Sequence, residues 1–177
     1  MAERILGAVL AGGQSSRFGS DKALAELDGH SLLTLAVDRL SEWCEKVVVV
    51  GREEAPAPTL PDWPRPGMGP LGGIAAALRL ARQDSFTAVL TIGVDSLGLP
   101  EDLPKVLHSA PAYVVAQPVI GLWPANADKA VMEILESDGR HSLRAFAERI
   151  GARGIDLASD PANINTPADL AAVRGRK

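Results

Sequence analysis

The sequence predicts an α/β fold in which a mostly parallel sheet lies between two layers of helices. Continuous apolar runs at residues 5–10, 47–50 and 86–94 are typical of strands that are buried on both faces. The segments between these runs repeat their apolar residues every three to four positions, which indicates amphipathic helices. Because strands and helices alternate along the chain, a three-layer α/β/α sandwich is the expected architecture.

Each element has its own signal. Leu33, Ala36, Val37 and Leu40 follow the helical period within a helix expected over residues 31–43, and a second helix is expected to begin near Leu71. Two strands are expected within residues 112–125, joined only by the tripeptide AQP, and a short strand near 152–156. The remaining helices are expected at residues 101–109, 127–137, 141–150 and from 167 onward.

Length and composition favour a single domain over residues 1–177. The net charge of −4 offers no general attraction for nucleic acid, and the chain has no apolar run long enough to span a membrane or to serve as a leader. Cys44 is the only cysteine, so an internal disulfide is excluded and a reducing cytoplasm is the expected location. Cys44 itself is expected on the apolar side of a helix, in the core.

The loop after the first strand, AGGQSSRFGSDK, has the composition of a polyphosphate-binding loop. Gly12 and Gly13 permit a sharp turn and close approach of the backbone to a ligand, and successive amides form an anion nest. Arg17 and Lys22 add cations that suit phosphate oxygens. The loop has neither the spacing of a P-loop nor that of a dinucleotide fingerprint. The alternative is a solvated strand-to-helix turn.

Two carboxylates follow the other strands. Asp95 ends the third strand, where it suits Mg²⁺, which commonly takes one or two protein carboxylates together with phosphate oxygens; a turn-forming aspartate fits equally well. Asp62 lies in a proline-rich loop, where it suits a nucleobase or a sugar, although composition alone favours a plain surface loop. Since ligands bind at the carboxyl ends of parallel strands, these loops are expected to converge. The glycines of GMGPLGG either place a helix amino-terminus near a ligand or permit tight packing.

The stretch NINTPADL, residues 163–170, predicts a helix start. Thr166 is the expected N-cap, Pro167 the first helical residue, and Asp169 completes a capping box. This interpretation leaves Asn163 and Asn165 without an assigned role.

Taken together, the motifs resemble the family of molybdenum cofactor guanylyltransferases (MobA). LAGGQSSRFGSDKA resembles the family signature L-A-G-G-x-S-x-R-M-G-x-D-K, GPLGGI its second loop, and Asp95 with Pro100 its strand-end motif. PVIGLWP resembles a later family strand and NINTPADL the carboxyl-terminal motif. The motifs occur in the family's order and cover nearly the whole chain.

The resemblance implies a cytoplasmic, single-domain nucleotidyltransferase with a Rossmann-like fold of the nucleoside-diphosphate-sugar-transferase type. It implies GTP and molybdopterin, or Mo-molybdopterin, as substrates, Mg²⁺ as cofactor, and partner proteins that insert the cofactor or receive it as molybdoenzymes. The residues it assigns to the nucleotide are Leu10, Ala11, Gly12, Gly13, Lys22, Asp62 and Asp95. It makes Lys22, Arg17 and Asp95 the catalytic residues, and Asp95 and Asn165 the metal ligands.

The chain departs from the family pattern at several points. Val50 stands where relatives carry a nucleotide-contacting asparagine, and the hairpin around Gln117 is shorter than usual, which leaves the acceptor open. Two alternatives therefore stay beside guanylyl transfer. One is nucleotidyl transfer with another nucleotide or acceptor, such as cytidylyl transfer to the same cofactor or transfer to a sugar phosphate. The other is a GTP-binding module that handles the cofactor without turnover.

Overall fold

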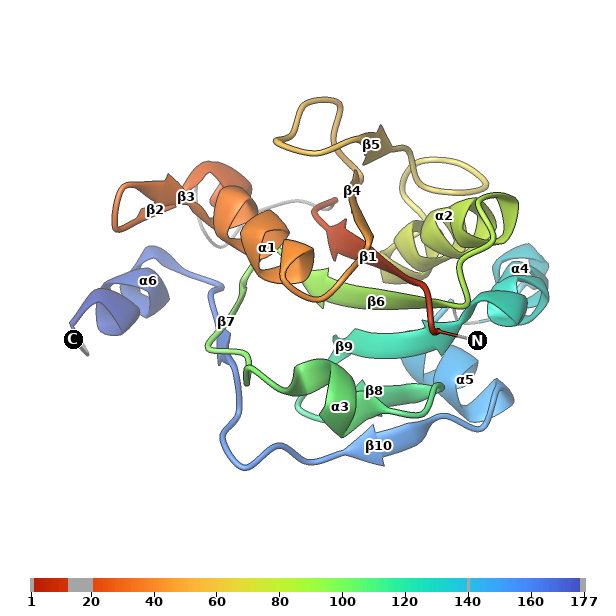
Figure 1. The fold of residues 1–177 in the computed structure, drawn as a ribbon. Helices are drawn as coiled ribbons and strands as arrows, with labels where there is room; N and C mark the ends of the chain where they lie inside the picture. The colour runs from red at the N-terminus through yellow and green to blue at the C-terminus, as the bar shows by residue number, and fades with distance from the viewer. Residues whose placement is uncertain (1, 13–20, 140, 176–177) are drawn as a thin grey trace.

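The computed structural model describes residues 2–12, 21–139 and 141–175, and it confirms the predicted α/β architecture (Figure 1). A seven-stranded sheet has the order β10-β8-β9-β6-β1-β4-β5. Its strands are β1 (Ile5–Leu10), β4 (Lys46–Val50), β5 (Thr59–Leu60), β6 (Ala88–Gly93), β8 (Ala112–Val114), β9 (Gln117–Pro124) and β10 (Arg153–Ile155). Within this sheet β9 runs antiparallel to both of its neighbours, and the other pairs are parallel.

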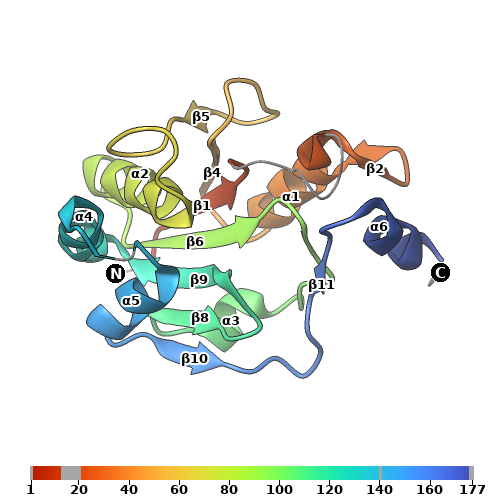
Figure 2. The same cartoon turned by 180° about the vertical axis from the view of Figure 1, so that it is seen from behind.

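Helices cover both faces of the sheet. The α-helices are α1 (Leu32–Ser41), α2 (Pro70–Gln83), α3 (Leu103–Leu107), α4 (Asp128–Glu136), α5 (Leu143–Arg149) and α6 (Pro167–Arg174), with short 3₁₀ turns η1 (Lys22–Leu24) and η2 (Ala125–Ala127). Figure 1 shows α1 and α3 in front of the sheet, and Figure 2, seen from behind, shows α2, α4 and α5 on the opposite face. The helices begin and end within three residues of the predicted positions.

Alternation along the central strands builds two apolar cores, one on each face. In β4, Val47 and Val49 belong to the core on the face covered by α1 and α3, whereas Val48 and Val50 belong to the core on the face covered by α2. Side chains of a strand alternate between faces, so a strand between two helical layers is apolar at every position. The continuous apolar runs therefore have a direct structural cause.

Helix α1 ends two residues before its predicted end at residue 43. Ser31 caps its start by accepting a hydrogen bond from the backbone N–H of Thr34, and the helix ends at Ser41. The expectation that Cys44 lies on a helix is therefore wrong. Cys44 lies in the connection to β4, partly buried, with Sγ 3.1 Å from the position that a Cβ of Gly7 would take. Burial raises the pKa of the Cys44 thiol to about 12, so it behaves as a packing residue.

Several paired elements are too short to be predicted from periodicity. They are the hairpin of β2 (Glu26–Leu27) with β3 (His30–Ser31), and the pair of β7 (Ser96–Leu97) with β11 (Ala162–Asn163). The second pair joins the turn after β6 to the chain segment that leads into α6. Both views show α6 beside the β2–β3 hairpin, and the Arg174 guanidinium donates a hydrogen bond to the Glu26 carbonyl.

The start of α6 confirms the predicted capping box. Thr166 Oγ1 accepts from the backbone N–H of Asp169 at 3.2 Å, and Asp169 Oδ2 accepts from the backbone N–H groups of Asn165 and Thr166, both at 2.9 Å. These donors, first the N–H of Asn165 and then that of Thr166, lower the pKa of the Asp169 carboxyl.

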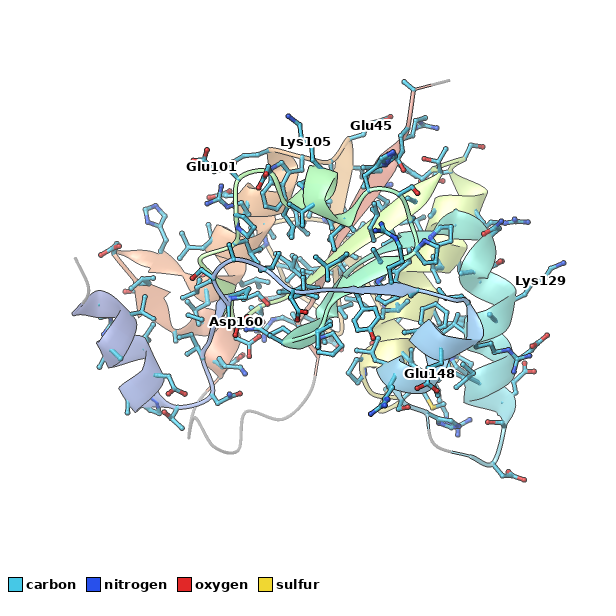
Figure 3. All side chains as sticks on the ribbon, turned by 90° about the horizontal axis from the view of Figure 1, so that it is seen from below. Glu45, Glu101, Lys105, Lys129, Glu148 and Asp160 are labelled. Atoms are coloured by element: carbon cyan, nitrogen blue, oxygen red, sulfur yellow. The ribbon has the colours of Figure 1, made fainter. Side chains whose placement is uncertain are left out.

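Charged side chains lie on the outside of the fold. Glu101, Lys105, Lys129 and Glu148 project away from the sheet and helices in Figure 3, and all four are exposed. Among the described residues, no helix is both long enough and apolar enough to cross a membrane.

Leu90 in the central strand β6 is fully buried, so Leu90→Ala is expected to lower the free energy of unfolding by about 2–5 kcal/mol. Leu24→Ala is the control, because Leu24 is 58% exposed and its truncation is expected to change stability by no more than about 0.5 kcal/mol. Urea unfolding of both variants measures the difference, and equal effects would contradict the assignment of the core.

Candidate active site

A cavity of about 460 Å³ opens at the carboxyl ends of β1, β4 and β6. Its walls come from the ends of these strands, from the loop that precedes α2, and from Val119 of β9. The predicted convergence of the loops is therefore observed. Of the residues assigned to the nucleotide, Leu10, Gly12, Lys22, Asp62 and Asp95 line this cavity.

Lys22 and Asp95 form an ion pair at one end of the cavity. Lys22 Nζ lies 2.9 Å from Asp95 Oδ2, and each side chain is about a fifth exposed, 19% and 18% respectively. The two residues are 73 positions apart in the sequence. Removing either charge would leave the other partly buried without this partner, so each holds the other in place.

The small size of Gly93 allows the Asp95 carboxylate to fold back over the end of β6. A Cβ built on Gly93 would lie 2.7 Å from Asp95 Oδ1, so a side chain at position 93 would displace the carboxylate. The Asp95 carboxylate thus pairs with Lys22 and occupies the space that a side chain at position 93 would take.

The loop after β1 crosses the end of β4 at very short range. Gly51 has a φ of +92°, and a Cβ there would lie 2.6 Å from the Cα atom of Gly12. Just before this crossing, the backbone N–H of Ala11 donates to the carbonyl of Val50 at 2.9 Å. Ala11 is buried and is not among the cavity-lining residues, so its nucleotide contact stays a prediction. Gly13 and Arg17 lie outside the described residues.

Arg52, which sequence reasoning missed, does not line the cavity but supports the turn that carries Lys22. Its guanidinium forms a two-pronged ion pair with Asp21, with Nη1 3.0 Å from Oδ1 and Nη2 2.8 Å from Oδ2. Hydrogen bonding from Arg52 is the main cause that lowers the pKa of the Asp21 carboxyl. Asp21 also caps η1, the turn that carries Lys22, by accepting from the backbone N–H of Ala23. The sequence feature that could have indicated Arg52 is its position two residues after the end of β4.

Asp62 lines the cavity from the proline-rich loop. Burial raises the pKa of its carboxyl, and a hydrogen bond from the backbone N–H of Gly67 opposes that shift. Asp62 thus lines the cavity and is partly desolvated, and its contact with a nucleotide stays a prediction. A partly buried carboxylate at a cavity wall is a typical acceptor for N–H donors of a ligand.

Helix α2 begins at the cavity wall. Gly69 is its N-cap with a φ of +72° and no side-chain cap, Pro70 is at the first turn, and both residues line the cavity. Unpaired backbone N–H groups at such a start favour anions or acceptor atoms. The glycines also permit tight packing, because a Cβ on Gly73 would lie 2.9 Å from Leu10 Cδ2. Both interpretations of GMGPLGG therefore apply to α2, which begins at the cavity and packs tightly against β1.

Asn165 lies near this edge without lining the cavity. Its backbone N–H bonds to Asp169, and its segment is brought beside Asp95 by the pairing of Asn163 with Ser96 in β11 and β7. The metal-binding role of Asn165 stays a prediction.

The donor set fits Mg²⁺ better than a metal that needs a full protein cage. No group of three or more His, Cys, Asp or Glu side chains suited to a metal occurs among the described residues. Mg²⁺ does not require such a group, since it commonly binds one or two carboxylates and completes its shell with substrate phosphates and water. Asp95 supplies one carboxylate at the cavity.

The parallel sheet, the glycine-lined cavity at its carboxyl edge and the cation beside a carboxylate define a nucleotide-binding α/β protein. The model of the MobA-like NTP transferase domain matches residues 7–158, and the chain belongs to this family of nucleotidyltransferases. A molybdenum cofactor guanylyltransferase of Acidiphilium cryptum is 35% identical, over 95% of this chain and 93% of the relative. That of Rhodobacter capsulatus is 34% identical, over 98% and 96%.

Solved structures agree on the fold. The molybdopterin-guanine dinucleotide biosynthesis protein A of Archaeoglobus fulgidus has a TM-score of 0.77 at 20% identity and covers 96% of this chain and 97% of its own. A CMP:2-keto-3-deoxy-manno-octonic acid synthetase complexed with CTP has a TM-score of 0.68 at 13% identity, covering 99% and 98%. The chain is therefore a nucleotidyltransferase enzyme with a fold of the nucleoside-diphosphate-sugar-transferase type, and its relatives act in molybdenum cofactor biosynthesis.

Gly51→Ala tests the crossing of the two loops. Gly29→Ala is the matched control, because Gly29 also has a positive φ, +82°, yet a Cβ there meets nothing within 4 Å. Gly29→Ala is expected to cost only the backbone strain of about 1–2 kcal/mol. Gly51→Ala is expected to cost about 1–3 kcal/mol more in urea unfolding, since the Gly12 backbone must move. Equal losses would contradict the close approach.

Asp62→Asn tests the partial burial of Asp62. Its folded-state pKa lies above the usual 3.8, so the contribution of Asp62 to stability falls as pH rises from that value through the folded pKa. Asp62→Asn removes this fall and is expected to raise the free energy of unfolding at pH 7 relative to wild type. Asp169→Asn should do the opposite, because the pKa of Asp169 is lowered and its ionised form stabilises the fold. Urea unfolding of both variants and the wild type at pH 7 measures the two effects, and effects of the same sign would refute the argument.

Proposed function

We propose that this enzyme transfers GMP from Mg·GTP to molybdopterin, or Mo-molybdopterin, and releases pyrophosphate to form the guanine dinucleotide cofactor. The observation that carries the proposal is the cavity itself, with the Lys22–Asp95 pair at one end and Asp62 with the start of α2 at another wall. The names of relatives at 34–35% identity support the acceptor.

In this proposal, Lys22 and Arg17 stabilise charge on the triphosphate and Gly12 and Gly13 present backbone amides to it. Asp95 would hold Mg²⁺, with Asn165 as a second candidate ligand, and the ion would neutralise charge on the phosphates. Because Lys22 and Asp95 pair at 2.9 Å, the proposed phosphate-binding cation and the proposed metal-binding carboxylate lie side by side at the cavity.

The step is a direct displacement at phosphorus. An oxygen of the acceptor's terminal phosphate forms a bond to the α-phosphorus of GTP, and the bond from that phosphorus to the bridging oxygen of pyrophosphate breaks. No electrons are gained or lost, and the anionic phosphate nucleophile needs no general base. The protein therefore contributes positioning and charge stabilisation.

Asp62 is proposed to select guanine over other bases at the end of the cavity that would hold the nucleoside. An ionised carboxylate accepts hydrogen bonds and donates none, so Asp62 suits the adjacent N1–H and N2–H₂ donors of guanine. Val50 in the neighbouring wall offers only an apolar contact. We also propose a cytoplasmic location, which rests on the single cysteine.

Lys22→Ala and Asp95→Ala are each expected to lower the rate of GMP transfer by about 10²–10³. Lys46→Ala is the control, because Lys46 also pairs with an aspartate, Asp84, at 3.2 Å, but starts β4 at the far end of the strand from the cavity. Steady-state turnover of the three variants measures the contrast. Near wild-type turnover of Lys22→Ala and Asp95→Ala would defeat the assignment.

The function is tested by incubating the purified enzyme with Mg²⁺, either GTP or CTP, and either molybdopterin or a sugar phosphate, and by following pyrophosphate and the dinucleotide product. Equimolar pyrophosphate and guanine dinucleotide from GTP alone are expected. Turnover with CTP alone would show that the enzyme is a cytidylyltransferase. Pyrophosphate release only with a sugar phosphate would show that molybdopterin is not the acceptor.

A further inference from the structure

Three polar side chains are buried among the described residues, and two of them bond to each other beside the active-site turn. They are Ser96, which directly follows Asp95 and is 5% exposed, and Gln117, the first residue of β9, which is 8% exposed. The third, Thr91, lies further back in β6. Buried polar groups are costly unless they are paired, so their partners define what they hold together.

Gln117 uses both ends of its amide. Its Oε1 accepts from Ser96 Oγ at 3.1 Å, and its Nε2 donates to the carbonyl of Pro161 at 2.9 Å. Ser96 Oγ in turn accepts from the backbone N–H of Gly93 at 3.3 Å. The chain of bonds runs from the end of β6 through the turn after Asp95 to a segment 44 residues beyond Gln117.

These bonds join three parts of the chain that surround Asp95. The Pro161 carbonyl immediately precedes β11, whose residues Ala162 and Asn163 pair with Leu97 and Ser96 of β7. A two-strand ladder with two residue pairs is too short to fix a register by itself. Gln117 adds a polar connection between this ladder and the main sheet, beside the apolar contacts of Leu99 and Ile164 in the core.

The short hairpin places Gln117 where it can make both bonds. Val114 of β8 pairs with Gln117, so only Val115 and Ala116 form the turn. The tripeptide AQP that the sequence marks as a shortened acceptor loop is thus partly strand, and its glutamine points into the interior.

We propose that Gln117, acting through Ser96, is a positioning residue that sets the Asp95 turn against the Asn163–Asn165 segment. The inference rests on the proposed function, in which Asp95 and Asn165 are the candidate metal ligands. Gln117 touches neither nucleotide nor metal in this account. It fixes the distance between the two segments that do.

The test compares Gln117→Leu and Ser96→Ala with Thr91→Val. Gln117→Leu keeps a similar volume and removes both bonds, and Ser96→Ala removes the link to the Asp95 turn. Thr91→Val is the matched control: Thr91 Oγ1 donates to the Val119 carbonyl at 2.6 Å and accepts from Trp123 Nε1 at 3.0 Å, bonds that reach neither Asp95 nor Pro161. All three lose buried hydrogen bonds, so all are expected to lower the Tm.

Two measurements separate positioning from loss of stability, both made well below the Tm. The first is calorimetric titration with GTP over a range of Mg²⁺ concentrations. Gln117→Leu and Ser96→Ala are expected to raise the Mg²⁺ concentration needed for half-maximal GTP binding by about 10- to 100-fold, whereas Thr91→Val leaves it unchanged. The second is amide hydrogen exchange, which should quicken over residues 94–98 and 162–166 in Gln117→Leu and not in Thr91→Val.

Each outcome decides the inference. Equal Mg²⁺ dependence in wild type and Gln117→Leu, or unchanged exchange over residues 162–166, would overturn it and leave Gln117 as a core residue. If the wild type binds no GTP at all, the proposed function fails separately, and the exchange measurement still decides whether Gln117 holds the two segments together.

Discussion

The active site depends on the in-register parallel pairing of β1 with β4 and β6. Leu10, the last residue of β1, is level with Val50 on one side and Gly93 on the other, so three strands end at the same height. Their loops therefore leave the sheet side by side, and Lys22 reaches Asp95 at 2.9 Å across 73 residues. A slip of one strand by a single residue would turn its side chains to the opposite core and remove this meeting point.

Small residues then determine the shape of the site. Gly51 lets two loops cross at a distance that a side chain at this position would not permit, and Gly93 leaves room for the Asp95 carboxylate. Such positions gain nothing for stability, since positive φ and close backbone contact are costly. The partly buried carboxylate of Asp62 has the same character, because its burial opposes ionisation. Strained backbone and a partly buried carboxylate that cluster around one cavity are expected at a ligand-binding site.

The sequence predicted the strands and helices well because long elements repeat their pattern often enough to be recognised. The convergence of the loops was anticipated because loops at one sheet edge must meet, and the family resemblance added the choice of five residues that line the cavity. The two-residue strands β5, β7 and β11 carry no measurable period. The Arg52–Asp21 pair and the bonds of Gln117 join positions remote in the sequence, so only the assembled fold reveals them. Cys44 was misplaced because apolar periodicity continues past the end of α1.

The central claim is that this cavity binds a guanine nucleotide with Mg²⁺ through Asp95. The most direct measurement is calorimetric titration of the wild type and of Asp95→Ala with GTP, CTP, ATP and UTP, each with and without Mg²⁺. The account predicts that GTP binds most tightly, that binding requires Mg²⁺, and that Asp95→Ala loses this requirement together with most of the affinity. Nucleotide binding that is absent, or that ignores both Mg²⁺ and Asp95, would contradict it.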